Sequence, residues 1–197
     1  MTEQSVRKKR IIEVARKVFA QKGYHLTTID EVAKRTGIAK GTVYLYFPSK
    51  EKLFLEVLKD GMEGLREKIF QEIKGIDDPK EKIERLIYIS LQFFEKHRSL
   101  FRTMLLGDIP RGEHKKTAKK AFKGYEEFMD WLSDIMREGI EKGVLRELKP
   151  QWLAIAFIGI MKDFLLHFIR KDGKTKLTEY YPVISQLFFK GALKEVK

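Results

Sequence analysis

The side chains with the clearest chemistry lie in one run from Thr27 to Phe54, TTIDEVAKRTGIAKGTVYLYFPSKEKLF. Tyr44 and Tyr46 are two positions apart in this run, and Lys40 and Lys50 lie on either side of them. Phenol and ammonium groups are common donors to the phosphate oxygens of nucleic acids. A motif used only for packing has no need of exposed tyrosines beside cations. The spacing therefore predicts a surface that contacts DNA.

The sequence offers few groups for other chemistry. It contains no Cys and four His, which excludes thiolate catalysis, disulfides and Cys-ligated metal sites. It has no Ser-His-acid arrangement, no glycine-rich phosphate loop and no carboxylate–histidine cluster at metal-ligand spacing. We therefore predict a protein that is not an enzyme and that carries no cofactor and no metal.

Two short helices joined by a tight turn are expected to hold the DNA-contacting residues. Thr27 and Thr28 are each followed three residues later by an acidic residue, which is typical of a capping box at a helix N-terminus. The first short helix is expected to end at Thr36, because Gly37 suits the left-handed turn conformation. The second covers residues 39–47, and its small first residues keep it slim enough to enter the major groove.

The charge distribution agrees with an anionic partner. The net charge is +12, and residues 1–60 hold 13 Lys and Arg against 7 Asp and Glu. Such a basic balance favours nucleic acid. The longest apolar stretch, residues 152–169, contains Lys162, Asp163 and His167, so we interpret it as a buried helix and not as a membrane span. Because the N-terminal residues are polar and basic, we predict a cytoplasmic protein without membrane contact.

Helical periodicity continues along the rest of the chain. Apolar residues recur at helical spacing, with helix boundaries indicated at Gly23, Pro79 and Gly143 among others. This pattern predicts an all-α fold of about nine helices. An N-terminal three-helix helix-turn-helix domain is expected in residues 1–50, and a larger helical ligand-binding and dimerisation domain in residues 51–197.

Residues 6–55 closely resemble the DNA-binding domain of the TetR/AcrR family of transcriptional repressors. The shared pattern starts with a Phe-x-x-x-Gly-Tyr element and a Thr-led helix. It continues through a Gly-Ile turn and a Gly-Thr-x-Tyr-x-Tyr-Phe helix, and it ends in Ser-Lys-Glu-x-Leu. The residues that carry the pattern are Phe19, Gly23, Tyr24, Thr28, Glu31, Val32, Ala33, Gly37, Ile38, Gly41, Thr42, Tyr44, Tyr46, Phe47, Ser49, Lys50, Glu51 and Leu53.

The resemblance implies which residues lie at the DNA. These residues, most of them expected on phosphates, are Thr28, Lys40, Gly41, Thr42, Tyr44, Tyr46 and Lys50. Ala39 stands where many members of the family carry Ser, which removes one possible hydroxyl contact. Leu45 stands where other members vary and read bases, so it meets either a thymine methyl group or nothing.

The last two helices are expected to form a dimer interface. The helix that begins near Pro150 is apolar nearly all round, which indicates burial on more than one side. The final helix adds Leu187, Phe188 and Phe189. In similar proteins these two helices form a four-helix bundle with their copies, and burial within a single subunit is the alternative. Two copies would read half-sites about 34–36 Å apart on one face of the DNA.

Aromatic and Met side chains in residues 51–197 exceed what a compact core requires, and such side chains can line an adaptable apolar pocket. Plain core is the other interpretation. The residues predicted to bind a ligand on this ground are Phe94, His97, Phe101, Met104, Phe122, Met129, Phe157, Met161 and Phe164. The basic segment from Arg111 to Lys120 favours an anionic amphiphile such as a fatty acyl thioester, unless it is only a solvated face.

These patterns predict a homodimeric repressor that binds a palindromic double-stranded DNA operator and releases it when a small lipophilic effector binds. The expected mechanism is a population shift, in which the ligand prefers a spacing of the two reading helices that does not fit the operator. An architectural DNA-binding protein without any ligand is the alternative.

Overall fold

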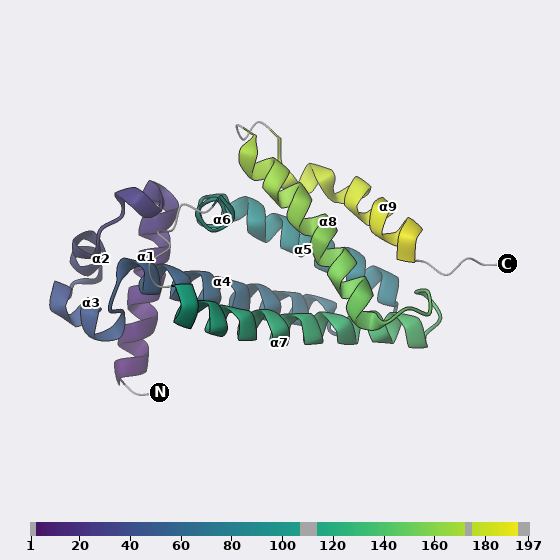
Figure 1. Ribbon diagram of the computed structural model, residues 1–197, viewed down its shortest axis with the longest axis horizontal. Coiled ribbons are helices and arrows are strands. Elements are labelled where there is room, and N and C mark those ends of the chain that lie inside the picture. Colours follow the sequence, from purple (N-terminus) through teal and green to yellow (C-terminus); the bar gives the residue numbers. More distant parts are fainter. Residues whose placement is uncertain (1–2, 107–113, 172–174, 193–197) are drawn as a thin grey trace. The chain divides into compact units, whose positions relative to one another are not determined.

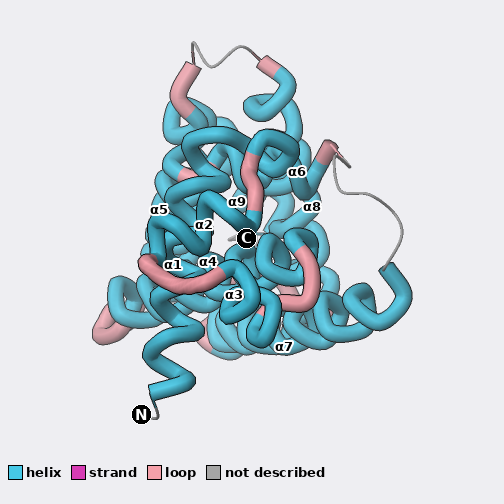
Figure 2. Tube along the Cα trace, turned by 90° about the vertical axis from the view of Figure 1, so that its left-hand side faces the viewer, coloured by secondary structure: helices cyan, strands magenta, loops and turns pink. Residues whose placement is uncertain are grey.

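The computed structural model describes residues 3–106, 114–171 and 175–192, with the backbone alone for residues 114–124 and 192. Every regular element within these ranges is helical (Figures 1 and 2), which confirms the predicted all-α class. The nine α-helices and one 3-10 helix are α1 (Glu3–Leu26), α2 (Ile29–Thr36), α3 (Lys40–Tyr46), α4 (Lys50–Ile73), α5 (Pro79–Lys96), α6 (Arg98–Leu105), α7 (His114–Glu141), α8 (Pro150–Arg170), η2 (Leu177–Tyr180) and α9 (Tyr181–Ala192).

The helices pack into two compact units. The first consists of Met1–Gly64 and His97–Gly112, and the second of Leu65–Lys96 and Glu113–Lys197. The sequence-based boundary after residue 50 places all of α4 except its first residue, Lys50, in the second domain. In the structure, however, the first half of α4 supplies fully buried side chains, among them Leu53 and Phe54, to the core of the first unit. Helix α4 therefore begins in one unit and ends in the other.

The core of the first unit is a single apolar cluster shared by five helices and the residue that ends α3. Helix α1 contributes one face at helical spacing, and α2, α3, the first half of α4 and α6 close around it. The members are Ile11, Ile12, Ala15, Val18, Phe19, Tyr24, Ile29, Val32, Ala33, Val43, Phe47, Leu53, Phe54, Val57, Leu58 and Leu100. The rings of Phe19 and Phe54 pack edge to face at 5.1 Å between centroids, a favoured aromatic geometry.

Helix α1 is interrupted at Gly23, where the sequence predicts its end. Gly23 has φ 75° and ψ 175°, a conformation that only glycine adopts readily. The Thr27 hydroxyl donates to the Gly23 carbonyl oxygen at 2.7 Å. The chain thus leaves the helix at Gly23 and closes one further turn before α2 begins.

The second unit contains the second half of α4 with α5, α7, α8, η2 and α9. A charged cluster joins α5 to α7: Lys82 and Lys142 lie 2.7 and 2.9 Å from the same Glu138 carboxylate. Gly143 ends the segment after α7 with φ 69°, as predicted. A Cβ atom at Gly139 would lie 2.7 Å from the side chain of Leu145, so a close approach requires glycine there.

Candidate nucleic-acid interface

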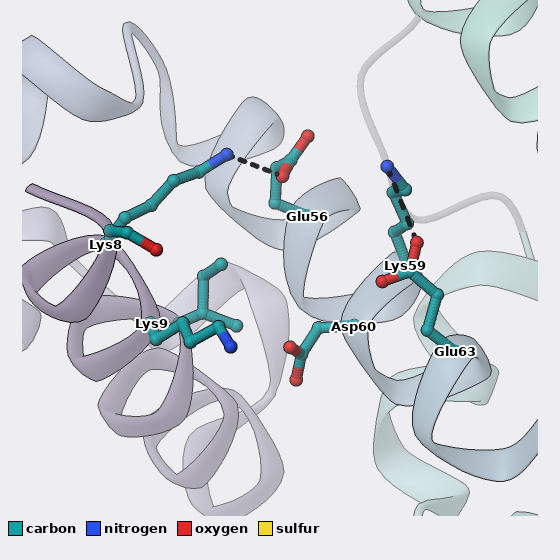
Figure 3. Close-up of a pocket in the computed structure, with 8 residues that line it drawn as sticks. Lys8, Lys9, Glu56, Lys59, Asp60 and Glu63 are labelled. Carbon is teal, nitrogen blue, oxygen red and sulfur yellow. Dashed lines mark hydrogen bonds and ion pairs between the residues drawn. The ribbon is translucent and has the colours of Figure 1, made fainter. Parts of the chain in front are cut away.

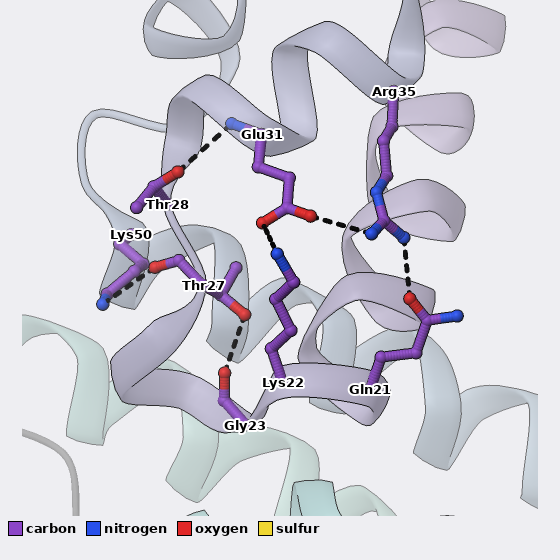
Figure 4. Close-up of polar contacts among 8 residues, drawn as sticks. All are labelled: Gln21, Lys22, Gly23, Thr27, Thr28, Glu31, Arg35 and Lys50. Carbon is purple, nitrogen blue, oxygen red and sulfur yellow. Dashed lines mark hydrogen bonds and ion pairs between the residues drawn. The ribbon is translucent and has the colours of Figure 1, made fainter.

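The N-terminus of α2 is fixed by half of the predicted capping box. The Thr28 backbone is extended, and its hydroxyl oxygen accepts a hydrogen bond from the Glu31 backbone N–H at 3.2 Å. The Glu31 carboxylate does not complete the box, because it accepts from Lys22 at 2.7 Å and from Arg35 at 2.8 Å (Figure 4). These contacts lower the pKa of Glu31, first through the hydrogen bond from Lys22. Glu31 therefore ties α2 to α1.

The turn between α2 and α3 has the geometry that the sequence predicts. Gly37 adopts φ 76° and ψ 32°, and its N–H donates to the carbonyl oxygen of Ala33 at 2.9 Å. The N–H of Ile38 donates to the same oxygen at 3.1 Å. This left-handed cap provides partners for the last carbonyl groups of α2 and ends the helix at Gly37, so that α3 can begin three residues later.

Helix α3 divides its side chains between the core and solvent. Val43 and the following Phe47 are buried, as expected, and they anchor the helix. Tyr44 is 42% exposed and Leu45 is 85% exposed, so the opposite face is open. Tyr46 differs from the prediction, because it is half-buried and packs against the core of the first unit. The phenol of Tyr44 is therefore the more accessible of the two.

The other predicted contacts surround this open face. Lys40, Gly41 and Thr42 form the first turn of α3, where Lys40 and Gly41 are exposed and Thr42 is half-buried. Lys40 forms a 2.9 Å ion pair with Asp30 of α2. The hydrogen bond from Lys40 to this carboxylate and the negative charge raise the pKa of Lys40. Thr28 is exposed at the start of α2. Six of the seven predicted residues thus lie on the helix-turn-helix, with Tyr46 partly buried.

Lys50 has different surroundings. It is the first residue of α4, and it is half-buried. Its ammonium group donates hydrogen bonds to the carbonyl oxygens of Tyr24, in the last turn of α1, and of Thr27, just after α1; Figure 4 shows the bond to Thr27. Burial lowers its pKa below the ordinary value. Its partners are backbone atoms 23 to 26 residues earlier in the chain, and no sequence signal identifies such a contact.

A charged hollow of about 220 Å³ lies between α1 and α4 (Figure 3). Its lining includes Lys8 and Lys9 of the basic N-terminal cluster that the sequence shows. The Lys8 ammonium forms a 3.1 Å ion pair with Glu56 of α4, so part of this cluster is neutralised within the chain. The sequence contains a signal for this pairing, because Glu56, Asp60 and Glu63 recur at helical spacing on α4 and form an acidic stripe. The complete lining is Ser5, Lys8, Lys9, Ile12, Glu56, Lys59, Asp60 and Glu63.

The predicted ligand residues are distributed over both units. His97, Phe101 and Met104 belong to the first unit, and the others to the second. Phe101, Phe157 and Met161 are buried; Phe94, His97, Met129 and Phe164 are half-buried; Met104 is exposed. The rings of Phe157 and Phe188 pack edge to face at 5.4 Å. The side chains of Phe122 and of the basic segment from Arg111 to Lys120 lie outside the described part of the structure.

Helix α8 is buried on one side only. Its inward stripe includes Leu153, Phe157 and Met161, whereas Trp152 and Ile155 are each 57% exposed. This helix is long and apolar enough to cross a membrane by length and composition, and 39% of its most apolar window is buried. Helix α9 packs beside it and leaves Val183 and Leu187 exposed. Each of the two helices thus carries exposed apolar side chains, and we refer to Trp152, Ile155, Val183 and Leu187 together as the apolar strip on α8 and α9.

Comparisons with known proteins cover both parts of the chain. Residues 11–57 match the family model described as bacterial regulatory proteins, tetR family. Residues 58–191 match the model described as YsiA-like protein, C-terminal region. The chain is 29% identical over 184 residues to the fatty acid metabolism regulator protein of Bacillus subtilis (strain 168), covering 92% of this chain and 93% of that protein.

Two solved structures share the architecture. The fatty acid degradation regulator FadR from Bacillus halodurans superposes with a TM-score of 0.77 at 26% identity, covering 93% of this chain and 98% of that one. The transcriptional regulator FadR from Bacillus subtilis, in complex with stearoyl-CoA, gives a TM-score of 0.78 at 24% identity over the same shares. At 24% identity, the similarity to the second structure shows a shared fold and nothing further.

Proposed function

This chain belongs to the tetR family of bacterial regulatory proteins, and from that premise we propose that it is a dimeric repressor of fatty acid metabolism genes. It binds a palindromic operator in the cytoplasm and releases the operator when a fatty acyl thioester binds. Members of the family are transcriptional regulators and not enzymes, so no reaction is assigned to the chain.

The observation that carries DNA binding is the open face of α3. Tyr44 and Lys40 are exposed there, while Val43 holds the same helix in the core. A helix that starts with Lys-Gly-Thr presents little bulk to the groove, and its phenol, hydroxyl and ammonium donors suit phosphate oxygens. The capped start of α2 and the Gly37 turn hold this face in a fixed orientation.

The apolar strip on α8 and α9 supports the dimer. Trp152 and Leu187 are 57% and 52% exposed, although both helices are otherwise core elements of the second unit. Covering large apolar side chains yields roughly 25 cal/mol for each Å² removed from water. A second copy of the same strip is a self-complementary partner, as a two-fold interface requires. Dimerisation also supplies the second reading helix that a palindromic operator needs.

The acyl thioester is proposed from likeness and composition together. The relative named as a fatty acid metabolism regulator matches nearly the whole chain, and the second unit contains Phe157, Met161 and Phe164 on one helix. Aromatic and Met side chains can repack around a flexible acyl chain. The basic residues between Arg111 and Lys120 are suited to the anionic end of such a ligand.

Helix α4 offers a path for the proposed release. It starts at Lys50 in the first unit and ends at Ile73 in the second. A ligand that favours a shifted position of the second half would move the first half with it, because a continuous helix transmits displacement along its axis. The ligand then stabilises dimers whose reading helices no longer match both half-sites.

Operator binding is tested with duplexes selected from a random pool by the purified protein. We expect inverted-repeat sequences, and we expect Tyr44→Phe to weaken binding by about tenfold through loss of one phosphate hydrogen bond. The circular dichroism spectrum and melting temperature should stay unchanged, since this hydroxyl lies on an exposed residue. A Tyr125→Phe variant, altered at an exposed tyrosine of the second unit, is the control. Failure to select any sequence would refute the proposal.

The dimer is tested by Trp152→Glu and Leu187→Glu, which place charges in the apolar strip. We expect sedimentation to show monomers, and specific DNA binding to fall by at least a hundredfold while helicity is retained. Gln186→Glu is the control, because it adds the same charge at an exposed polar position of α9 outside the strip. If both the Trp152→Glu and the Leu187→Glu variants remain dimers, the interface lies elsewhere.

The effector is tested with stearoyl-CoA, stearate and free coenzyme A as probes. Of the three probes, we expect only stearoyl-CoA to release the selected duplex. At a hundredfold excess over its dissociation constant, it should raise the melting temperature of the protein by about 5–10 °C. Release by stearate alone would mean that the carboxylate and acyl chain suffice. If no acyl compound shifts the melting temperature or the DNA affinity, a ligand-independent architectural protein is the better description.

A further inference from the structure

The ammonium group of Lys50 lies among three backbone carbonyl oxygens, two in the last turn of α1 and one in the short link to α2. Its Nζ atom is 3.0 Å from the oxygen of Tyr24, 3.4 Å from that of His25 and 3.1 Å from that of Thr27. It also lies 4.5 Å from the centroid of the Tyr24 ring, within the range of a cation–π interaction. We call this arrangement the Lys50 clasp.

The backbone conformation explains why these oxygens are available. Because α1 ends at Leu26, the carbonyl groups of its last turn lack the N–H partners that a longer helix would supply. The hydrogen bond from the Thr27 hydroxyl to the Gly23 oxygen closes the segment into a tight turn. Its carbonyl oxygens then converge on a single point, which a cation with several donors can occupy.

The hydrogen-bonding capacity of lysine limits what else Lys50 can do. An ammonium group has three N–H donors and no acceptor, and the clasp provides three acceptors for them. A phosphate contact, which the family resemblance implies for Lys50, would require at least one of these bonds to be broken. Lys40 is different, because it is 52% exposed and its partner is a single exposed carboxylate, Asp30.

We propose that Lys50 is a positioning residue for DNA reading, which holds the α1–α2 joint against the start of α4 and does not contact a phosphate. Thr27 immediately precedes Thr28, the N-cap of α2, and α2 leads through Gly37 into α3. The clasp therefore sets the direction of the helix-turn-helix relative to the start of α4. This inference rests on the proposed function, since it takes α3 as the element that reads DNA.

Two matched substitutions separate positioning from phosphate contact. Lys50→Met and Lys40→Met both remove an ammonium group and keep an unbranched side chain. Affinity is measured for the selected operator and for a shuffled duplex of equal length, over a range of salt concentrations. A lost phosphate contact reduces the salt slope by about 0.9 and weakens both duplexes about equally.

We expect Lys40→Met to behave as a lost phosphate contact, with a salt slope reduced by about 0.9 and both duplexes weakened about equally. Lys50→Met should keep the wild-type salt slope, weaken the operator at least tenfold and weaken the shuffled duplex less than twofold. Amide hydrogen exchange without DNA should be faster in α2 of Lys50→Met than in the wild type, and unchanged in Lys40→Met. A slope lowered by about 0.9 in Lys50→Met, or wild-type affinity for both duplexes, would overturn the inference.

A second variant keeps the test decisive if Lys50→Met folds poorly. Lys50→Gln removes the charge but retains two N–H donors, so positioning predicts an unchanged salt slope and a smaller loss of operator affinity. Phosphate contact predicts the lowered slope for this variant too. If the wild type itself selects no operator, the proposed function fails, while the exchange measurement on α2 still decides whether the clasp holds that joint.

Discussion

The Nζ atom of Lys40, in the first residue of α3, lies 2.9 Å from a carboxylate oxygen of Asp30, in the first turn of α2. This ion pair joins the two helices of the helix-turn-helix across its open side. The side chains are 52% and 64% exposed, so solvent screens the pair and it adds little to stability. A DNA phosphate can therefore replace Asp30 as the partner of Lys40.

Asp30→Asn is expected to strengthen DNA binding by about threefold to tenfold. The substitution releases Lys40 and removes a negative charge beside the face that we assign to DNA, while the free energy of unfolding changes by less than about 0.5 kcal/mol. Fluorescence anisotropy with the selected operator measures the change, and Glu63→Gln on α4 is the control for a general charge effect. Weaker binding by Asp30→Asn would show that the pair orients Lys40 for its contact.

Gly37 and Gly41 should respond in opposite ways to alanine. Gly37→Ala forces a side chain into the left-handed region at φ 76°, which costs about 1–2 kcal/mol. Gly41 has no positive φ and nothing within 4 Å of an added Cβ, so Gly41→Ala should stabilise α3 by about 0.5–1 kcal/mol. Chemical denaturation measures both values.

The same pair separates stability from DNA contact. Gly41→Ala adds a methyl group to the face that we assign to DNA, so it should bind the operator less tightly in spite of its greater stability. Gly37→Ala should melt earlier yet keep most of its affinity at low temperature, where it remains folded. If Gly41→Ala binds the operator as tightly as the wild type, Gly41 does not lie at the DNA interface.

Leu45 is expected to contact a thymine methyl group. It is 85% exposed on a helix that is otherwise anchored in the core, and apolar side chains distinguish thymine through its methyl group. Replacing thymine by uracil at one operator position should therefore weaken wild-type binding by about fourfold, the worth of roughly one buried methyl group. Leu45→Ala should bind both operators equally, and Leu45→Met should retain the difference. An equal uracil penalty in Leu45→Ala would contradict the contact.

The cluster around Glu138 should make the second unit sensitive to acid. Hydrogen bonds, first from Lys82 and then from Lys142, hold the pKa of Glu138 below its ordinary value of 4.5. A lowered folded-state pKa means that the stabilisation is complete above pH 4.5 and is lost as the pH falls through the folded value. Glu138→Gln should thus melt about 2–4 °C earlier at neutral pH, and the difference should shrink as the pH falls below the ordinary pKa of the carboxyl group.

Thermal denaturation monitored by circular dichroism across this pH range measures the effect. Glu126→Gln, at an exposed position of the same helix, should show no comparable difference at any pH. A melting difference for Glu138→Gln that persists unchanged in acid would mean that the side chain acts through packing and not through its charge.

The sequence by itself determined the helices, the turn and the class of protein. The cap at Thr28, the glycine turn at Gly37 and the spacing of Val43 and Phe47 are local signals, because each depends on residues within one or two helical turns. The same local pattern carried the family resemblance, which the family models confirm over residues 11–57 and 58–191. Lys40 and Tyr44 were placed on an exposed face for this reason.

Only the tertiary structure decided which partners the polar groups take. The Glu31 carboxylate binds Lys22 and does not complete the capping box. Lys50 donates hydrogen bonds to carbonyl oxygens 23 to 26 residues earlier in the chain. Tyr46 packed against the core, and the first half of α4 joined it. These outcomes depend on how helices distant in sequence meet, and the periodicity of a single helix shows which face is buried but not which atoms it will touch.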